Sequence, residues 1–363
     1  MIHLIYPHRD RISAPDVIGA TLAAALRSID DVRTYEVDSF EKICPSEGDI
    51  LLGHAYQYAP TIYRRSVRQP GWARRILLQP YNGDWDQVGF LDDIIDHCDL
   101  FLTITGRHWF DRVPATHAAR WFPKMIHVDL AVNRHSFPQV KHDIASAGRR
   151  RILYIGNDHP GKNIPYLSAI AEQWGGGTID WAGRGAPAPH LRQLGFIDFS
   201  SIDGRALIAN YDFLITAGCA DANPTTVLEA MSWGLIPICT PTSGYDGEPG
   251  IVNIPTADVA ASCAILDGLQ NAEAAALAAL RQAGEERLTT HFTWQRFVEQ
   301  VVDAIRSDAS PPILPRRPET PLGGPRPTPR FAAKLIGKNA AYQVDRRLPG
   351  AAETLRRFVR TWL

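Results

Sequence analysis

The sequence predicts an α/β protein made of two doubly wound, Rossmann-like domains that face each other across a cleft, followed by a proline-rich C-terminal arm. Three observations lead to this prediction. The chain of 363 residues is too long for one typical hydrophobic core. Short apolar runs alternate with longer helical patterns, which is typical of βαβ units. The alternation begins again after a polar stretch, residues 135–150.

The first half contains six short apolar runs that predict the strands of a parallel sheet. Runs without strict alternation suit strands that are buried on both faces. Helical patterns lie over residues 14–29 and 92–99. We therefore expect a first domain over residues 1–140. Its expected strands are residues 3–6, 33–37, 49–54, 75–80, 100–105 and 125–130.

The same pattern predicts a second parallel sheet in a domain that covers residues 141–310. Helices are expected between and after its strands, the last over residues 291–305. Doubly wound sheets bind ligands at the carboxyl ends of their strands, so we expect the site in the cleft between the domains. The expected strands are residues 150–156, 178–183, 211–216, 235–240 and 251–255.

Composition narrows the function classes. The formal net charge of −1 offers no electrostatic case for nucleic acid as a partner. The five cysteines form no C-x-x-C pair and no metal-ligand spacing, so we expect reduced thiols, a cytoplasmic protein and no metal site. The first apolar run is too short for a secretory signal peptide, and no stretch is apolar enough to span a membrane.

The C-terminal part differs in composition from the rest. Residues 311–329 contain eight prolines, which predicts an extended linker over residues 311–330. From residue 311 onward there are 11 Lys and Arg against 3 Asp and Glu. Within the basic tail, residues 331–363, helical spacing over 351–363 separates an apolar face from arginines. Either this helix lies on an anionic membrane surface at the inner face of the membrane, or it packs on the protein.

The stretch DANPTTVLEAMSWG, residues 221–234, predicts a helix that starts soon after a strand. Asn223 suits the N-cap, Pro224 the first helical position and Gly234 the C-terminal end. Free backbone N–H groups at the positive end of such a helix form an anion site. These are the N–H groups of Thr225, Thr226 and Val227.

A diphosphate at this helix start would also need a cation. Lys162, in the turn that follows strand 150–156, is the candidate, although it would also suit an ordinary surface position. Glu229 lies one turn after Thr225 on the same helix face and suits a ribose diol. Asp221, in the loop before the helix, suits the hydroxyls of a sugar. Taken alone, a glutamate at position 229 is more often an ordinary solvated or structurally paired carboxylate.

A second motif points to a different ligand. GRGAPA, residues 183–188, fits the G-x-G-x-x-A pattern of dinucleotide-binding loops. Pro187 and Pro189 disfavour a helix there, and the pattern belongs after the first strand of a domain rather than the second. A nicotinamide cofactor is therefore the weaker alternative, and no cofactor is expected.

Three blocks of the sequence resemble the GT-B glycosyltransferases of family 4 and their close relatives. Residues 126–138 are similar to their interdomain segment, and residues 152–167 to their strand–turn–lysine block. Residues 211–244 resemble their signature of two acids separated by seven residues, followed by Glu-Ala-Met. The resemblance covers roughly residues 126–305. It implies transfer of a sugar from a nucleotide diphosphate sugar to a glycan or lipid-linked saccharide, with retention and without a metal.

The resemblance also implies roles for single residues. Glu229 would hold the ribose, Asp221 the donor sugar, and Lys162 with residues 225–227 the diphosphate. His54, at the end of strand 49–54, falls where the family often has a histidine near the donor sugar, although a core role suits it equally. The remaining implied donor-binding residues are Gly156, Asn157 and Arg184.

The sequence departs from the family pattern at two of these positions. Asp221 replaces the usual glutamate, and Asn157 stands where an arginine usually contacts the phosphates. Arg184 would supply that charge from a neighbouring loop. Two alternatives stay open: a catalytically silent paralogue that binds a nucleotide or glycan as an assembly partner, and an enzyme that hydrolyses or epimerises nucleotide sugars.

The first-domain side of the cleft is expected to come from three stretches: the loop after the first strand, residues 7–15, and two polar and aromatic stretches, residues 79–86 and 106–112. Their aromatic and arginine residues suit a saccharide and a phosphate-bearing lipid equally well. GDWD, residues 83–86, mimics a metal-binding D-x-D motif of other glycosyltransferases. Its place in a first-domain loop favours a loop or acceptor-side role.

Overall fold

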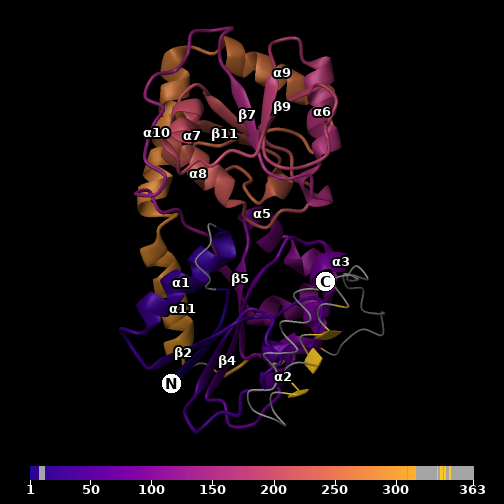
Figure 1. The fold of residues 1–363 in the computed structure, drawn as a ribbon, viewed down its shortest axis with the longest axis vertical. Coiled ribbons are helices and arrows are strands. Elements are labelled where there is room, and N and C mark those ends of the chain that lie inside the picture. Colours follow the sequence, from indigo (N-terminus) through magenta and orange to yellow (C-terminus); the bar gives the residue numbers. More distant parts are fainter. Residues whose placement is uncertain are drawn as a thin grey trace.

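The computed structural model describes residues 1–7, 13–308 and 310–315. It also describes seven positions further along the chain: 333, 336, 337, 339, 340, 343 and 344. It contains two parallel six-stranded sheets, each covered by helices and placed one above the other along the long axis (Figure 1). The predicted linker beyond residue 315, the tail helix over residues 351–363 and residues 8–12 of the loop expected to line the cleft lie outside the described residues.

The first sheet has the strand order β2-β1-β3-β4-β5-β6, and all six predicted strands are confirmed. The helical pattern over residues 14–29 forms α1 (Ala14–Leu26), which begins at Ser13, whose side chain accepts a hydrogen bond from the Asp16 N–H. The strands are β1 (Ile2–Ile5), β2 (Val32–Tyr35), β3 (Ile50–Gly53), β4 (Arg74–Pro80), β5 (Leu100–Ile104) and β6 (Met125–Val128). The other helices are α2 (Ile62–Ser66), α3 (Trp85–Val88), α4 (Asp92–Ile95) and α5 (Arg107–Phe110).

The second sheet has the order β12-β11-β10-β7-β8-β9, and its five predicted strands are confirmed. The strands are β7 (Ile152–Ile155), β8 (Ile179–Ala182), β9 (Leu191–Gly195), β10 (Phe213–Thr216), β11 (Ile236–Cys239) and β12 (Val252–Asn253). The helices are α6 (Ile164–Gln173), α7 (Ile202–Ile208), α8 (Thr225–Trp233), α9 (Val259–Asn271), α10 (Ala274–Thr290) and α11 (Trp294–Arg306).

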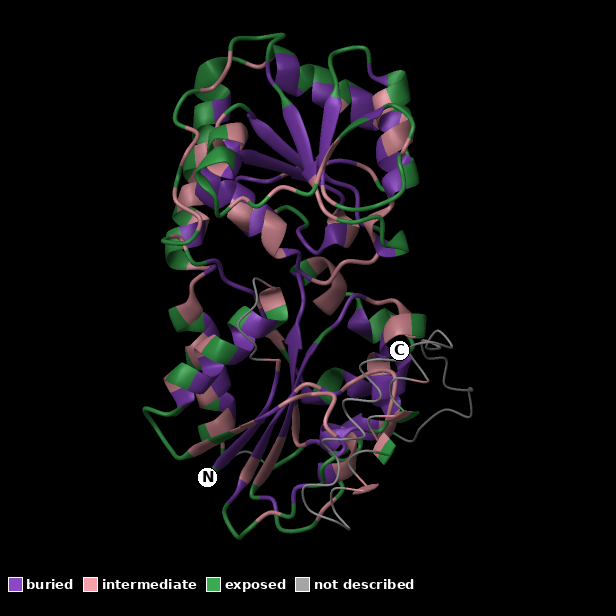
Figure 2. Cartoon of the chain, in the orientation of Figure 1, coloured by how far each residue is buried: buried purple, intermediate pink, exposed green. Residues whose placement is uncertain are grey.

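Strand β9 was not predicted, and its place in the sheet explains why. It pairs only with β8 at the edge, so its residues LRQLG are mostly exposed or half-buried. Edge strands lack the continuous apolar run that marks a central strand. The residues of β8 and β10, by contrast, are all buried (Figure 2).

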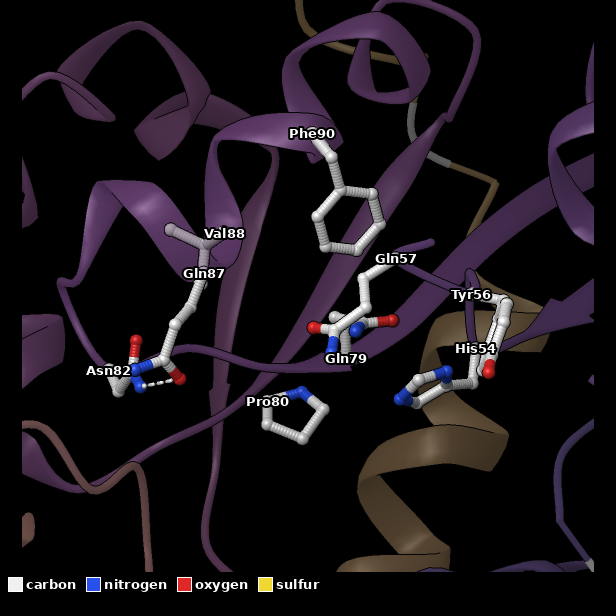
Figure 3. A pocket seen from close by; sticks show the side chains of 9 residues that line it. All are labelled: His54, Tyr56, Gln57, Gln79, Pro80, Asn82, Gln87, Val88 and Phe90. Atoms are coloured by element: carbon white, nitrogen blue, oxygen red, sulfur yellow. Dashed lines mark hydrogen bonds between the residues drawn. The ribbon is translucent and has the colours of Figure 1, made fainter. Parts of the chain in front are cut away.

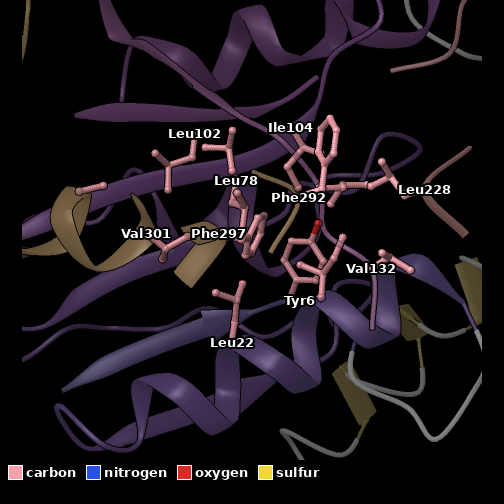
Figure 4. Close-up of a cluster of buried hydrophobic side chains, with 14 of the residues drawn as sticks. Tyr6, Leu22, Leu78, Leu102, Ile104, Val132, Leu228, Phe292, Phe297 and Val301 are labelled. Atoms are coloured by element: carbon pink, nitrogen blue, oxygen red, sulfur yellow. The ribbon is translucent and has the colours of Figure 1, made fainter. Parts of the chain in front are cut away.

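The two sheets share one hydrophobic cluster at their junction. Leu228 of α8 belongs to the same cluster as Tyr6 and Val132 of the first half of the chain (Figure 4). Helix α11, within the range expected for the second domain, also packs here, because Phe297 and Val301 lie on one apolar face and are fully buried. The chain therefore returns to the first sheet at α11, and the domain limits remain predictions.

The buried face of α11 leads to a stability prediction. Phe297→Ala removes a side chain that is 1% exposed, and we expect it to lower the free energy of unfolding by about 3–5 kcal/mol, as the loss of a buried ring does elsewhere. Urea denaturation followed by circular dichroism measures this. Arg296→Ala, an exposed position on the same helix, is the control and should change stability by less than about 0.5 kcal/mol. Equal effects of the two substitutions would contradict the packing of α11.

Candidate functional site

The N-terminus of α8 lies beyond the carboxyl end of β10, as predicted, but its cap differs from the prediction. The helix begins at Thr225 with Pro224 as N-cap, so the prediction that Asn223 caps the helix is wrong. The Asn223 Oδ1 instead accepts a hydrogen bond of 2.9 Å from the Leu130 N–H of the first domain. At the other end, Gly234 has φ 90° and ends the helix as predicted.

Two of the three predicted N–H groups remain available for an anion. The Val227 N–H donates to the Pro224 carbonyl at 3.2 Å, so the expectation of a free N–H is wrong there. The N–H groups of Thr225 and Thr226 meet no acceptor among the described residues. The anion site of α8 is thus smaller than expected, and a doubly charged group would need another cation.

Lys162 and Asp221 meet directly. Lys162 ends a 3₁₀ turn, Pro160–Lys162, and its Nζ forms an ion pair with the Asp221 Oδ2. The two loops are also joined through the backbone, where the Cys219 N–H donates to the Gly161 carbonyl at 2.9 Å. Both side chains remain partly exposed, 28% and 19%, so a ligand can reach either. The structure therefore brings the predicted cation next to the first of the two predicted acids.

Glu229 lies one turn into α8 and is partly buried. Burial raises the pKa of its carboxyl group to about 7, and a hydrogen bond with the Thr225 side chain acts in the opposite direction. Both protonation states are therefore populated near neutral pH. The ionised form offers two acceptor oxygens, which suits a pair of neighbouring hydroxyls.

Gly156 and Asn157 form the turn that follows β7. The Gly156 carbonyl accepts a hydrogen bond of 2.8 Å from the Trp181 indole, and the Asn157 carbonyl accepts one of 2.8 Å from the Tyr154 hydroxyl. The Asn157 Oδ1 accepts from the His159 N–H at 3.1 Å. In this structure the Asn157 side chain thus stabilises the turn that leads to Lys162.

Arg184 lies in the loop between β8 and β9. Its exposed guanidinium group stacks over the Phe196 ring, 4.4 Å from the ring centroid. No helix starts within residues 183–190, all of which the structure describes, and β9 follows directly. The G-x-G-x-x-A pattern therefore lacks the helix N-terminus on which a dinucleotide-binding loop depends.

His54 follows β3. Its backbone N–H donates to the Ile5 carbonyl at 2.8 Å, and its imidazole ring packs edge-on against the ring of Tyr6. Burial lowers the pKa of the imidazole to about 4, so the ring is neutral near pH 7. Its Nδ1 is shielded from solvent and has no hydrogen-bond partner among the described residues. The side chain borders a cavity of about 250 Å³ in the first domain (Figure 3).

The first domain holds the loop that carries Asp221. Asn82 donates from its Nδ2 to the Ala220 carbonyl at 3.0 Å, and the Trp109 indole donates to the Asp221 carbonyl at 2.7 Å. The Gly106 N–H donates to the Ala222 carbonyl at 2.8 Å. With the bond from Leu130 to Asn223, four consecutive residues, 220–223, are held from the first domain.

Three of these contacts come from the stretches that the sequence singled out, residues 79–86 and 106–112. Their partners in the second domain could not be predicted, because no pattern along the chain links residues more than 100 positions apart. Gly106 is needed for a steric reason, since a Cβ atom there would lie 1.6 Å from the Gly244 carbonyl oxygen. Within the part of the chain that the structure describes, no group of three or more His, Cys, Asp or Glu is placed to hold a metal ion.

No family model and no curated protein matches the sequence. Solved structures do match the fold. Sucrose-phosphate synthase from Thermosynechococcus elongatus has a TM-score of 0.61 at 14% identity, covering 84% of this chain and 98% of that one. HepE from Anabaena, solved with UDP and glucose, has a TM-score of 0.54 at 10% identity, covering 84% and 99%.

TarM has a TM-score of 0.54 at 11% identity, covering 80% of this chain. The present chain spans only 58% of the length of TarM. None of the helices in the described residues is long and apolar enough to cross a membrane. These likenesses show that the chain has the GT-B glycosyltransferase fold, as the resemblance of its sequence implied.

The contact between Trp109 and the Asp221 carbonyl can be tested without a ligand. Trp109→Phe keeps a ring but removes the donor, and a typical hydrogen bond contributes about 0.5–1.5 kcal/mol. We therefore expect amide hydrogen exchange over residues 219–223 to become several-fold faster, as measured by mass spectrometry. Trp294→Phe, the same change in α11, is the control and should leave exchange in this loop unchanged. Unaltered exchange in Trp109→Phe would show that the indole does not hold the loop.

Proposed function

We propose that the protein is a glycosyltransferase that moves a sugar from a nucleotide diphosphate sugar to a hydroxyl group of a glycan or lipid-linked saccharide. The transfer retains the anomeric configuration and uses no metal. One observation carries the proposal: within a GT-B fold, Lys162 pairs with Asp221, which lies four residues before the start of α8, and Glu229 follows one turn into that helix. The UDP and glucose held by the similarly folded HepE support a nucleotide sugar as donor.

In this proposal the diphosphate binds between Lys162 and the free N–H groups of Thr225 and Thr226. Lys162 forms an ion pair with Asp221 in the structure, so donor binding would exchange one anionic partner for another. Asp221 is then released to accept hydrogen bonds from hydroxyls of the donor sugar. As the bond between sugar and diphosphate breaks, negative charge grows on the leaving group, and fixed donors stabilise it there.

Glu229 holds the nucleotide ribose in the same proposal. Its ionised carboxyl group accepts hydrogen bonds from both ribose hydroxyls, while the Thr225 side chain orients it. His54 lies on the opposite side of the junction, on the first domain, and faces the sugar rather than the nucleotide. Because its pKa is low, it acts as a neutral hydrogen-bonding group and not as a cation.

Asn157 and Arg184 have weaker roles. We propose that Asn157 shapes the turn before Lys162, and that Arg184 contributes to phosphate binding only if it leaves its stacking position on Phe196.

We further propose a cytoplasmic enzyme whose basic tail, residues 331–363, contacts an anionic membrane surface. The excess of Lys and Arg in the C-terminal part supports this.

The direct ion pair between Lys162 and Asp221 also favours a second candidate, a catalytically silent paralogue that binds a nucleotide or glycan as an assembly partner. In such a protein the two side chains would satisfy each other permanently. Incubation with a panel of nucleotide sugars separates the candidates, because an active transferase slowly hydrolyses its donor in the absence of acceptor. Donor binding without any turnover would favour the silent paralogue. If the rate of donor hydrolysis stays the same when acceptors are added and no transfer product forms, the third alternative, an enzyme that hydrolyses nucleotide sugars, is favoured.

Removal of the charged groups tests the proposed donor site. Loss of one transition-state donor typically costs about 2.7–4 kcal/mol, so Lys162→Ala should lower kcat roughly 100- to 1,000-fold. Glu229→Ala should lower kcat/KM by weakening donor binding. Initial rates with the donor selected by thermal-shift screening measure both. Lys42→Ala and Glu47→Ala, two exposed positions of the first domain, are the controls. Near-normal rates in both Lys162→Ala and Glu229→Ala, with unchanged melting temperatures, would contradict the proposal.

The pKa of Glu229 predicts how donor affinity depends on pH. Burial raises this pKa to about 7, and the ribose needs the ionised carboxyl group, so affinity should rise from pH 6 to pH 8 and level off above it. Isothermal titration with a nucleotide sugar measures this, because its diphosphate diester does not titrate in that range. Glu229→Gln should bind more weakly and lose the pH dependence. If donor affinity rises with pH in Glu229→Gln as steeply as in the wild-type protein, another titrating group causes the pH dependence.

A further inference from the structure

We propose that two histidine–aspartate pairs form a pH-sensitive clasp across the junction of the two domains. The clasp holds the junction closed at mildly acidic pH and loosens as the pH rises. Its members are His108 with Asp246 and His291 with Asp129. This property goes beyond the proposed function, because it concerns the arrangement of the domains and needs no nucleotide sugar.

The first pair joins α5 of the first domain to the loop between β11 and β12. The His108 Nδ1 lies 3.1 Å from the Asp246 Oδ2, and the Arg112 Nη2 lies 3.7 Å from the same oxygen. The His108 side chain is 10% exposed, whereas those of Asp246 and Arg112 are more open to solvent. Helix α5 lies at the junction between the two sheets (Figure 1). A group that titrates therefore helps to fix α5 on the second domain.

The second pair joins the two segments by which the chain passes between the domains. Asp129 directly follows β6, and His291 directly follows α10, where the chain turns into α11 and returns to the first sheet (Figure 1). The His291 Nε2 lies 2.8 Å from the Asp129 Oδ2, and the two side chains are 18% and 10% exposed. This pair therefore holds both crossings together.

Histidine is important here because its charge changes between about pH 5 and 8, whereas lysine and arginine stay charged. Four ion pairs between described residues join residues 1–140 to residues 141–308, and a histidine is the cation in two of them. A protonated imidazole bonds to a carboxylate more strongly than a neutral one does. The ionic attraction across the junction therefore decreases when the histidines lose their protons. The other two pairs, with arginine as the cation, are Arg112 with Asp246 and Arg134 with Glu285.

The surroundings of Asp129 leave His291 as its titrating partner. His127 lies 3.4 Å from the Asp129 Oδ1, but its Nε2 donates to the Thr105 carbonyl at 2.8 Å. Burial lowers the pKa of His127, so its ring is neutral near pH 7. His291 is therefore the neighbour of Asp129 whose charge changes as the pH rises from mildly acidic values.

The other ionisable groups beside the clasp keep their charge in this range. Burial raises the pKa of the Tyr245 hydroxyl, near Asp129, and of the Cys239 thiol, near Asp246. Both groups therefore stay protonated and uncharged. Two further ion pairs lie close by, neither of which contains a histidine: Arg107 with Asp111, and Arg287 with Glu248.

Low pH therefore favours the closed junction. When both histidines are protonated, each pair adds an ionic attraction that exists only while the domains are in contact. When the histidines are neutral, this attraction is absent, so raising the pH favours opening. A partly exposed ion pair shifts an equilibrium by about 1.4- to 5-fold, so two independent pairs shift it by about 2- to 25-fold.

Two backbone amides report the opening of the junction directly. The Gly106 N–H donates to the Ala222 carbonyl, and the Leu130 N–H donates to the Asn223 side chain, both across the junction. Such amides exchange with solvent only when their hydrogen bonds break. Their protection factors correct for the faster intrinsic exchange at higher pH, so they measure the opening equilibrium itself. Amides at the centres of β5 and β10 report the opening of a single domain instead.

Hydrogen exchange of the full-length protein between pH 5.5 and 8, followed by NMR, tests the proposal. We expect the protection factors of the Gly106 and Leu130 amides to fall by about 2- to 25-fold over this range, while those in β5 and β10 stay constant. A double variant, His108→Asn with His291→Gln, puts a neutral amide in place of each bonded ring nitrogen. It should show low protection of the two amides at both pH values and no fall between them.

Three further variants separate the clasp from other groups. Asp246→Asn leaves both histidines in place and should make the fall smaller, which keeps the test decisive if the double variant is unstable. His142→Gln, an exposed histidine of the second domain, should keep the full fall. Glu229→Gln should keep it as well, although it removes a carboxyl group whose pKa burial raises to about 7.

Three results would overturn the inference: protection that does not fall in the wild-type protein, a full fall in both the double variant and Asp246→Asn, or a fall that is lost in His142→Gln or Glu229→Gln. None of these measurements uses a nucleotide sugar. Failure of the Lys162 and Glu229 substitutions to lower turnover would remove the proposed function and leave the clasp standing. The two failures are therefore distinguishable.

Discussion

The structure depends on four hydrogen bonds by which the first domain holds residues 220–223 of the second. Three of the acceptors are consecutive backbone carbonyls, so the first domain fixes the path of the loop and leaves the Asp221 side chain to its ion pair with Lys162. The loop follows β10 and leads into α8, so the same bonds also position the helix start. The loop that carries Asp221 and the start of α8 are thus held by residues of both domains.

In this arrangement the backbone of the loop, residues 220–223, is fixed, whereas the side chains of Lys162 and Asp221 can change partners. The backbone around Asp221 is fixed by hydrogen bonds and by the close approach of Gly106 to Gly244. The ion pair between Lys162 and Asp221 involves side chains alone and is partly exposed. In the proposed function, a diphosphate would replace Asp221 as the partner of Lys162 while the loop keeps its backbone hydrogen bonds. A rigid backbone with an exchangeable ion pair suits a site that binds and releases an anionic ligand.

The described residues on the two sides of the junction differ in the charged and polar groups that they contribute. The second domain contributes a lysine, free N–H groups and two carboxyl groups, one of which titrates near neutral pH because it is buried. Among the described residues, the cavity of the first domain is bordered by carboxamides and by the imidazole of His54, whose pKa is lowered by burial. Charged chemistry suits a nucleotide diphosphate, and neutral chemistry suits a sugar.

The sequence by itself determined eleven of the twelve strands in the described residues, the helix after β10 and the glycine at its C-terminal end, because buried parallel strands and helix ends leave local patterns of apolar residues and Gly. It missed β9, whose edge position leaves no apolar run, and it misread Asn223, because a cap is a local pattern while the actual partner, Leu130, is 93 positions away. Only the tertiary structure decided that Lys162 pairs with Asp221, that Glu229 has a raised pKa and that the first domain holds the Asp221 loop. Each of these depends on burial or on contacts between distant residues, which no local pattern encodes.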